Sequence, residues 1–269
     1  MRWANESGIM KRMEGRVALI TGGGAGIGAE SALQFSREGA RIIVVDLNEQ
    51  TGQAAADAVV ARGGEAIFVR ADVTNEDSIR AAADAGMAKF GRIDALLCSA
   101  GGSLPADSPI TEVDMAVWDR TMVLDVKGTM LACRHVIPKI IAAGGGSVVN
   151  MSSGAGLRGA NPAHIYTAAK GAIISLTRTL SGTYALKNVR VNCICAGRIN
   201  TERVRRTYGM PGEPGSVPDR QNVTEQLKTY PFWMGEPGDI AAIALFLASN
   251  ESRMITGAAI AADGGRSAY

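Results

Sequence analysis

Tyr166 and Lys170 lie four residues apart in the segment HIYTAAKGAI (164–173), a spacing that places two side chains on one face of a helix. A lysine ammonium close to a phenol stabilises the phenolate by Coulomb attraction. A tyrosine in that setting can act as a general acid or base near neutral pH. Ordinary surface helices also carry this spacing, so the pair needs support from other segments of the chain.

A glycine-rich segment, TGGGAGIGAE (21–30), follows the first apolar run of the chain and contains Gly22, Gly26 and Gly28. Glycines at this spacing permit a tight turn and let the backbone approach a pyrophosphate, which the N-terminus of a following helix attracts. A plain glycine-rich turn is the alternative interpretation. The position between an expected strand and an expected helix favours a dinucleotide site.

Asp46 ends the second apolar run, RIIVVD (41–46), and no arginine directly follows it. A carboxylate at this place can accept hydrogen bonds from the adenosine ribose hydroxyls of a dinucleotide and would repel a 2′-phosphate. Taken alone, Asp46 could be an ordinary loop residue. Together with the glycine-rich segment it predicts NAD rather than NADP as the cofactor.

The elements that must position these residues alternate along the chain. Short β-branched runs are separated by helix-length segments, which predicts an α/β fold of the Rossmann type, with a doubly wound parallel sheet of about seven strands and helices on both faces. The expected strands span 16–20, 41–46, 65–72, 92–98, 147–153, 188–194 and 257–263. We expect one domain over 14–269, preceded by a tail over 1–13 whose order the sequence leaves open. We also expect a substrate lid at about 198–231, where Gly, Pro and charged residues interrupt the pattern.

Composition excludes several classes of protein. Apolar residues make up 46% of the chain and charged residues 20%, which is typical of a soluble protein with a core. The net charge of +2 gives no reason to expect nucleic-acid binding, and neither a secretory signal nor a membrane span is apparent. We expect no metal site, and a cytoplasmic protein whose cysteines are reduced core residues, because none has C-x-x-C spacing: Cys98, Cys133, Cys193 and Cys195.

Three motifs in this order resemble the short-chain dehydrogenase/reductase (SDR) family, in its single-domain branch: TGGGAGIG, Tyr166-x-x-x-Lys170, and ITGAAIAADGG near the C-terminus. The resemblance covers about residues 14–265. It implies an oxidoreductase that moves a hydride between a nicotinamide cofactor, here NAD (NAD+/NADH), and a secondary alcohol or ketone. It also suggests a homotetramer that packs through helices around 112–141 and 164–185.

The resemblance assigns roles to single residues. Ser153, 13 residues before Tyr166, would hydrogen-bond the substrate oxygen, Tyr166 would transfer its proton, and Lys170 would bind the nicotinamide ribose. The pair Asp72 and Val73 would contact adenine, Ala100 and Gly101 would line the cofactor, and Ile199 and Thr201 would hold the carboxamide. The full expected cofactor set is Gly22, Gly26, Ile27, Gly28, Asp46, Asp72, Val73, Ala100, Gly101, Tyr166, Lys170, Gly197, Ile199 and Thr201.

Three positions depart from the family pattern. Cys98 and Ser99 replace the usual Asn-Asn, and Ala196 replaces a proline next to Gly197. The third departure is in LDVKGTM (124–130), where Asp125 stands at the place of the asparagine of the catalytic tetrad. Its main-chain carbonyl could still hold a water, but an ionised carboxylate cannot donate a hydrogen bond and would draw the ammonium of Lys170 away from the tyrosine. We expect an active enzyme with an altered pH profile rather than an inactive one.

Two rival functions remain open. One is an NADPH-dependent carbonyl or 3-ketoacyl reductase, against which Asp46 argues. The other is a dinucleotide-binding sensor or scaffold without turnover, against which Ser153, Tyr166 and Lys170 argue and which Asp125 keeps open.

The remaining polar and aromatic side chains carry weaker signals. We interpret an arginine group in the lid as solvent-exposed or facing another subunit, although it could meet an anionic substrate. His164 is interpreted as a loop or pocket-wall residue, and two tryptophans as packing residues, of which the second borders the lid. These residues are Arg203, Arg205, Arg206, Trp118 and Trp233. The sequence does not identify the alcohol or ketone.

Overall fold

The core of the protein is one sheet in which all neighbouring strands are parallel, in the order β3-β2-β1-β4-β5-β6-β7. It is seen in a computed structural model that describes residues 11–159, 161–208 and 232–268. The strands are β1 (Val17–Thr21), β2 (Arg41–Asp46), β3 (Ala66–Arg70), β4 (Ala95–Cys98), β5 (Gly146–Ser153), β6 (Val189–Ala196) and β7 (Ala259–Ala262).

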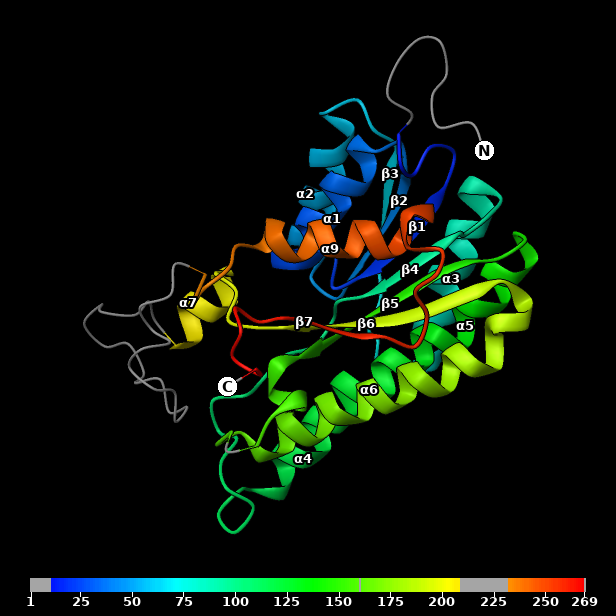
Figure 1. The fold of residues 1–269 in the computed structure, drawn as a ribbon. Helices are drawn as coiled ribbons and strands as arrows, with labels where there is room; N and C mark the ends of the chain where they lie inside the picture. Colours follow the sequence, from blue (N-terminus) through cyan, green and yellow to red (C-terminus); the bar gives the residue numbers. More distant parts are fainter. Residues whose placement is uncertain (1–10, 160, 209–231, 269) are drawn as a thin grey trace.

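Helices cover both faces of this sheet (Figure 1). One face carries α1 (Gly26–Arg37), α2 (Glu49–Val60) and α9 (Pro237–Ala248), and the other carries α3 (Glu76–Phe90), α5 (Gly128–Ala142) and α6 (His164–Tyr184). A short helix, α4 (Met115–Thr121), leads through the π-helical segment η1 (Met122–Lys127) into α5, and α7 (Glu202–Tyr208) follows β6. Single 3-10 turns are η2 (Gly154–Leu157), η3 (Ala185–Lys187) and η4 (Asn250–Ser252). Within the described ranges, no helix combines the length and apolar character that crossing a membrane requires.

Local sequence explains where several helices begin and end. The side chain of Asn75 accepts a hydrogen bond from the Ser78 N–H at the start of α3, and Gly91 ends that helix in the left-handed region with φ 76°. Pro237 opens α9, where Glu236 and Asp239 form a reciprocal capping box. These local signals determine where α3 starts and ends and where α9 starts.

The sequence-based prediction of the fold class is confirmed, with small corrections to strand ends. The third strand was expected over 65–72 but ends at Arg70, because the Asp72 carboxylate accepts bonds from the N–H and the hydroxyl of Thr74 and forms a turn. The sixth strand was expected over 188–194 and continues through Ala196, because its last residues still pair with β5 and β7.

The predicted terminal tail and the predicted lid fall partly outside the described residues. Residues 1–10 and 209–231 lie there, and the structure bears on neither. Met13 is fully buried, and its N–H donates to the Glu38 carbonyl at 2.8 Å. Packing of the chain against the sheet therefore begins before residue 14.

The four cysteines are free thiols and all are buried. A hydrogen bond with Cys133 and burial raise the pKa of the Cys98 thiol. A hydrogen bond with Cys195, together with burial, likewise raises the pKa of Cys193. The prediction that the cysteines are core residues is confirmed.

Candidate active site

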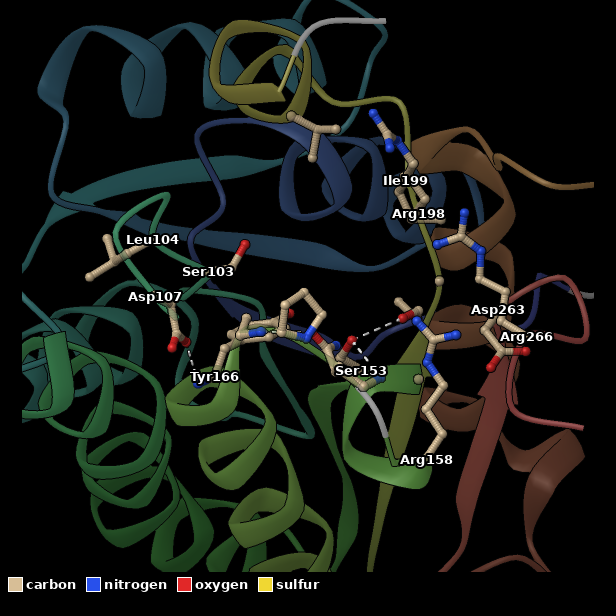
Figure 2. Close-up of a pocket in the computed structure, with 18 of the residues that line it drawn as sticks. Ser103, Leu104, Asp107, Ser153, Arg158, Tyr166, Arg198, Ile199, Asp263 and Arg266 are labelled. Carbon is tan, nitrogen blue, oxygen red and sulfur yellow. Dashed lines mark hydrogen bonds between the residues drawn. The ribbon is translucent and has the colours of Figure 1, made fainter. Parts of the chain in front are cut away.

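A pocket of about 270 Å³ opens at the carboxyl ends of β5, β6 and β7 (Figure 2). Parallel sheets place ligand sites at this edge, where the loops after the strands meet. The pocket is lined by residues of five segments, which are 103–107, 153–166, 196–199, α7 and 263–266. Both Ser153 and Tyr166 line it, so the structure brings together two residues that the sequence analysis selected for catalysis.

Ser153 is the last residue of β5 and is paired in register with Ala196 of β6. Its Oγ donates to the Ala196 carbonyl at 3.3 Å and accepts from the Ala155 N–H at 3.2 Å. The bond to the carbonyl is long for a hydroxyl donor. A substrate oxygen in the pocket could therefore compete for this proton at low cost.

Tyr166 lies in the first turn of α6, and an aspartate from a distant loop determines where that helix starts. Asp107 is buried, and its carboxylate accepts from the backbone N–H groups of Ile165 at 3.1 Å and Tyr166 at 2.7 Å. The N-cap residue, Ala163, offers no side-chain acceptor. Asp107 thus caps α6 and holds Tyr166 against the pocket, which the sequence analysis did not foresee.

Lys170 lies behind Tyr166, with only 4% of its surface exposed. Its Nζ lies 5.4 Å from the centroid of the Tyr166 ring, donates to the Met151 carbonyl at 3.1 Å, and lies 3.6 Å from Oδ1 of Asp125. The ammonium is therefore shared between the tyrosine ring, one strand carbonyl and one buried carboxylate.

Asp125 is fully buried in the π-helical segment η1. Its Oδ1 accepts from the Gly102 N–H at 2.9 Å, while Oδ2 has no hydrogen-bond partner among the described residues. The sequence analysis expected the main-chain carbonyl of Asp125 to be available to a water. In the structure this carbonyl accepts a hydrogen bond from the Thr129 hydroxyl at 2.7 Å. A carbonyl oxygen has two lone pairs, so one site for a water is left there. Thr129 was missed because only the helix brings it within reach.

The glycine-rich turn between β1 and α1 fits a dinucleotide pyrophosphate. Gly22 has φ +63° and its missing Cβ would lie 2.7 Å from the Ala100 nitrogen, while a Cβ on Gly28 would collide with the Gly22 carbonyl. The α1 N-terminus has neither a capping side chain nor an acidic residue in its first turn. Ile27, between the last two glycines, packs on the core and anchors the turn. The free N–H groups and the dipole of α1 therefore point toward a turn that stays open because its glycines carry no side chains.

Asp46 lies beside this turn at the end of β2. Its Oδ2 accepts from the Gly24 N–H at 2.9 Å and its Oδ1 from the Asn48 N–H at 2.9 Å, which orients the carboxylate. Each oxygen retains a lone pair for a ribose hydroxyl. Arg70 of β3 is the register partner of Asp46, and its Nε donates to the Leu47 carbonyl at 3.3 Å. A cation thus lies near Asp46, although none is adjacent to it in sequence.

The other residues expected at the cofactor lie at the same edge. Asp72 and Val73 follow β3. Ala100 and Gly101 follow β4, and Gly101 has φ +140°, with its missing Cβ directed at Oδ1 of Asp125. This glycine therefore connects the cofactor edge with the buried carboxylate.

On the opposite side of the crevice, the segment after β6 is fixed by backbone contacts. The Gly197 N–H donates to the Ala262 carbonyl at 2.9 Å, and buried Ile199 forms an isolated bridge with Gly235. The Thr201 Oγ1 accepts from the Val204 N–H at 3.2 Å, and its Cγ2 would lie 3.0 Å from a Cβ on Gly26. Thr201 thus faces the glycine-rich turn across the crevice.

Three arginines that the sequence analysis did not select converge on the pocket, and we call them the arginine cluster: Arg158 after η2, Arg198 after β6 and Arg266 after β7. Figure 2 shows them with Asp263 on one side of Ser153, and Tyr166 with Asp107 on the other. No local motif marks these arginines. Each comes from a different loop.

Several secondary candidates also have defined places. Of the lid arginines, Arg203 lines the pocket, Arg205 bonds the Asn200 side chain at 2.7 Å, and Arg206 is exposed. The first α6 residue, His164, accepts the Ile110 N–H at 3.0 Å through Nδ1 and does not line the pocket. Trp118 is 37% exposed on α4. Trp233 supports Arg266, whose guanidinium carbon lies 3.5 Å from the ring centroid.

Comparison with known proteins agrees with this geometry. A family model described as enoyl-(acyl carrier protein) reductase matches residues 22–267. The cis-4-hydroxycyclohexanecarboxylate dehydrogenase of Sinomonas cyclohexanicum is 35% identical over 254 residues, which cover 94% of this chain and 97% of that protein. The D-threitol dehydrogenase of Mycolicibacterium smegmatis is 36% identical over 255 residues, which cover 94% of each chain.

Solved structures show the same likeness. A short-chain type dehydrogenase/reductase from Mycobacterium ulcerans matches with a TM-score of 0.83 and 31% identity, over 95% of this chain and 91% of that one. Levodione reductase matches with a TM-score of 0.85 and 31% identity, over 96% of this chain and 99% of that one. Since the likeness in sequence and in fold extends over nearly the whole chain, this protein belongs to the short-chain dehydrogenase/reductase family, which uses nicotinamide dinucleotides, and it is an alcohol dehydrogenase or ketone reductase.

Proposed function

We propose that this enzyme uses NAD(H) and interconverts a secondary alcohol and a ketone, with Tyr166 as the general acid and base. One observation carries the proposal. Tyr166 and Ser153 line one pocket, and the Lys170 ammonium lies 5.4 Å from the tyrosine ring. This arrangement can bind one oxygen atom, exchange its proton and stabilise the resulting phenolate.

The proposed cofactor site runs along the carboxyl edge of the sheet. The pyrophosphate would meet the turn of Gly22, Gly26 and Gly28, and the adenosine ribose would meet Asp46. The adenine would lie near Asp72 and Val73, with Ala100 and Gly101 lining the path toward the pocket. Gly197, Ile199 and Thr201 would border the nicotinamide. The bound cofactor supplies the acceptor or donor of the hydride.

The chain's own residues would handle the proton. During oxidation Ser153 would donate a hydrogen bond to the substrate oxygen, and ionised Tyr166 would take the hydroxyl proton as the carbon loses its hydride. During reduction Tyr166 would return that proton to the oxygen. Lys170 would stabilise the phenolate and bind the nicotinamide ribose hydroxyls, and Asp107 would keep Tyr166 in place through its backbone N–H.

Asp125 is proposed to position Lys170. Its Oδ1 lies 3.6 Å from Nζ, and the Gly102 N–H fixes that oxygen. The same charge competes with the phenolate for the ammonium, so we propose that Asp125 gives the proton transfer a different pH profile from the one that an asparagine would give.

The runner-up function is an NADPH-dependent carbonyl or 3-ketoacyl reductase, and Arg70 is the observation that favours it. Its guanidinium lies near Leu47, where a 2′-phosphate would need a cation. Asp46 is closer to the glycine-rich turn and would repel that phosphate, so NAD is preferred. The ratio of kcat/KM with NAD+ and NADP+ decides between the two, and a ratio in favour of NADP+ would reject our assignment.

We also propose a homotetramer. The segment from α4 into α5 exposes four apolar side chains, which are 37–61% accessible: Met115, Trp118, Val123 and Met130. Exposed apolar groups concentrated on one segment are typical of contact surfaces. Light scattering after size-exclusion chromatography tests the proposal, and a monomeric mass at micromolar concentration would contradict it.

The function itself is tested by a screen of sugars, polyols, cyclic alcohols and hydroxy acids with NAD+, in which NADH absorbance is followed. We expect oxidation of at least one secondary alcohol. Bound NADH without turnover of any member of the panel would favour the non-catalytic sensor instead.

A further inference from the structure

The start of α7 contacts two loops at the carboxyl edge of the sheet. Within the described residues, α7 makes no extensive contact with any other helix or strand. Thr201, directly before α7, approaches the glycine-rich turn, because its Cγ2 would lie 3.0 Å from a Cβ on Gly26. Arg203, in the first turn of α7, reaches the loop after β4. Side-chain contacts with these two loops therefore help to determine where α7 lies.

The guanidinium of Arg203 lies with its face against Gly102. A Cβ at Gly102 would lie 2.6 Å from Cζ and 2.7 Å from both Nη1 and Nη2 of this arginine. A point at nearly equal distances from these three atoms lies over the face of the guanidinium plane and not at its edge. Nη1 also donates to the Ser103 carbonyl at 3.3 Å. Arg203 thus holds the loop with its face and one edge, and a side chain at residue 102 would collide with it.

The backbone of Gly102 also binds the buried carboxylate behind Lys170. Its N–H donates to Oδ1 of Asp125 at 2.9 Å, and the same oxygen lies 3.6 Å from the Lys170 Nζ. Asp125 is fully buried and Lys170 is 4% exposed, so their interaction is screened little by water. Consecutive contacts therefore connect Arg203 of α7 with Lys170.

We infer that Arg203 is a positioning residue, which docks α7 on Gly102, keeps the Gly102 N–H on Asp125 and so limits the pull of that carboxylate on Lys170. The inference rests on the proposed function, because it takes Lys170 as the group that stabilises the Tyr166 phenolate. A hydrogen bond from the N–H stabilises the carboxylate charge. When that bond loosens, Asp125 attracts the ammonium more strongly, and the phenolate loses part of its stabilisation.

The charge of Arg203 could also act on Tyr166 directly, through space. Arg203 is exposed, so water and salt screen its charge. The charged groups of the described residues that contact Lys170 or line the pocket with Tyr166 are Asp107, Asp125, Arg158, Arg198, Arg203, Asp263 and Arg266. Of these, Asp125 and Arg203 both contact Gly102. Stacking and charge can be separated, because a lysine keeps the charge but has no planar group to stack.

The test compares Arg203→Lys with Arg203→Gln, each in the wild type and in the Asp125→Asn background. Arg206→Lys and Arg206→Gln are the matched controls, since Arg206 is exposed on the same helix and does not line the pocket. Two measurements on the full chain need no substrate. Amide hydrogen exchange follows the Gly102 N–H, and ultraviolet difference absorbance against the matching Tyr166→Phe protein follows ionisation of the Tyr166 phenol.

We expect the Gly102 N–H to exchange about 2- to 10-fold faster in both Arg203 variants, because one hydrogen bond is weakened. The midpoint of Tyr166 ionisation should rise by about half a pH unit to one pH unit in both variants, because the phenolate is stabilised less. In the Asp125→Asn background this rise should largely disappear, since no carboxylate is left to pull on Lys170. The controls should match the wild type in both measurements.

Several results would overturn the inference. Unchanged Gly102 exchange, or an unshifted Tyr166 midpoint, would show that the contacts do not transmit the effect of Arg203. A rise of equal size with and without the Asp125 carboxylate would show that the effect bypasses Asp125. Wild-type behaviour of Arg203→Lys, with a change only in Arg203→Gln, would assign the effect to charge alone.

Failure of the proposed function would look different. An enzyme that oxidises no member of the alcohol panel would reject that function, whereas Gly102 exchange and the Tyr166 titration would still decide whether Arg203 acts through Asp125. The two failures are therefore distinguishable.

Discussion

The side that we propose for the cofactor and the side that we propose for the substrate are built from different groups. On the cofactor side, a turn of glycines and a helix N-terminus present backbone N–H groups, with Asp46 as the main charged side chain. On the substrate side, the lining is made by side chains from loops after four different strands, including the arginine cluster. A backbone site needs particular residues at fixed spacings in one segment, whereas a side-chain site can be assembled from anywhere in the chain.

This difference explains why the half of the site that contains the glycine-rich turn can be predicted from a single sequence. Gly28 of the turn cannot be replaced without a steric clash, because a Cβ at this position would overlap the Gly22 carbonyl. The side chains of the arginine cluster face a pocket, where another residue would change specificity without disturbing the fold. The following predictions separate these two kinds of contribution.

The largest effect is expected for Tyr166→Phe, which should separate chemistry from cofactor binding. Removing the phenolic hydroxyl removes the proton donor and acceptor, so kcat should fall by roughly 10²- to 10⁴-fold. The Kd of NADH should change little, because the glycine-rich turn and Asp46 are untouched. Steady-state kinetics and fluorescence titration measure both. Equal activity of the mutant and the wild type on the alcohol panel would show that the mechanism is wrong.

Gly28→Ala should do the reverse and damage cofactor binding. The new methyl group overlaps the Gly22 carbonyl, so the turn must move and the Kd of NADH should rise roughly 10- to 100-fold. Gly182→Ala is the control, because a Cβ at Gly182 in α6 meets nothing within 4 Å. The control should bind NADH normally and be stabilised by about 0.5–1 kcal/mol. Unchanged NADH binding in Gly28→Ala would place the pyrophosphate elsewhere.

Asp46→Ser should change the choice of cofactor rather than the rate. Removing the carboxylate removes repulsion of a 2′-phosphate and leaves Arg70 nearby, so the preference for NAD+ over NADP+ should fall by roughly 10- to 100-fold. Asp57→Ser on the exposed side of α2 is the matched control and should not alter the preference. If Asp46→Ser retained the wild-type ratio of kcat/KM values, Asp46 would not be the determinant.

The smallest change is expected for Asp125→Asn. Asp125 lies between the proposed cofactor side and the proposed substrate side of the site. The amide can still accept the Gly102 N–H at Oδ1, but the negative charge 3.6 Å from Lys170 is gone. Lys170 should then stabilise the phenolate more strongly, so the acid limb of the kcat/KM profile should move to lower pH, with a change of a few-fold in rate near neutral pH. Asp119→Asn on exposed α4 serves as the control. An unchanged pH–rate profile would remove Asp125 from the proton transfer.

Much of the site could be predicted because its signals are local. Tyr166 and Lys170 belong to one helix, and their spacing alone places both side chains on one face. Asp46 could be placed beside the turn because parallel strands end at a common edge. The helix cap by Asp107 could not be predicted, since it bridges 59 residues of sequence to reach the Tyr166 N–H.

The structure also changed the interpretation of residues that had been singled out. The sequence analysis treated three arginines as one group, namely Arg203, Arg205 and Arg206. Only Arg203 lines the pocket. Their positions around a short helix send the side chains in different directions. Trp233 appeared as a packing residue at the edge of the lid, and its partner is Arg266, 33 residues further along the chain.

By itself, the sequence determined the parallel α/β fold, the glycine-rich turn and the Tyr166–Lys170 pair, because these depend on periodicity and on short spacings within single segments. Only the tertiary structure decided which charges meet: Asp125 with Lys170, Asp107 with the start of α6, and three arginines around one pocket. Burial increases the electrostatic interaction energy of such contacts, since charges removed from water interact strongly with the groups next to them. Which groups become neighbours is a property of the packed chain and not of any one segment.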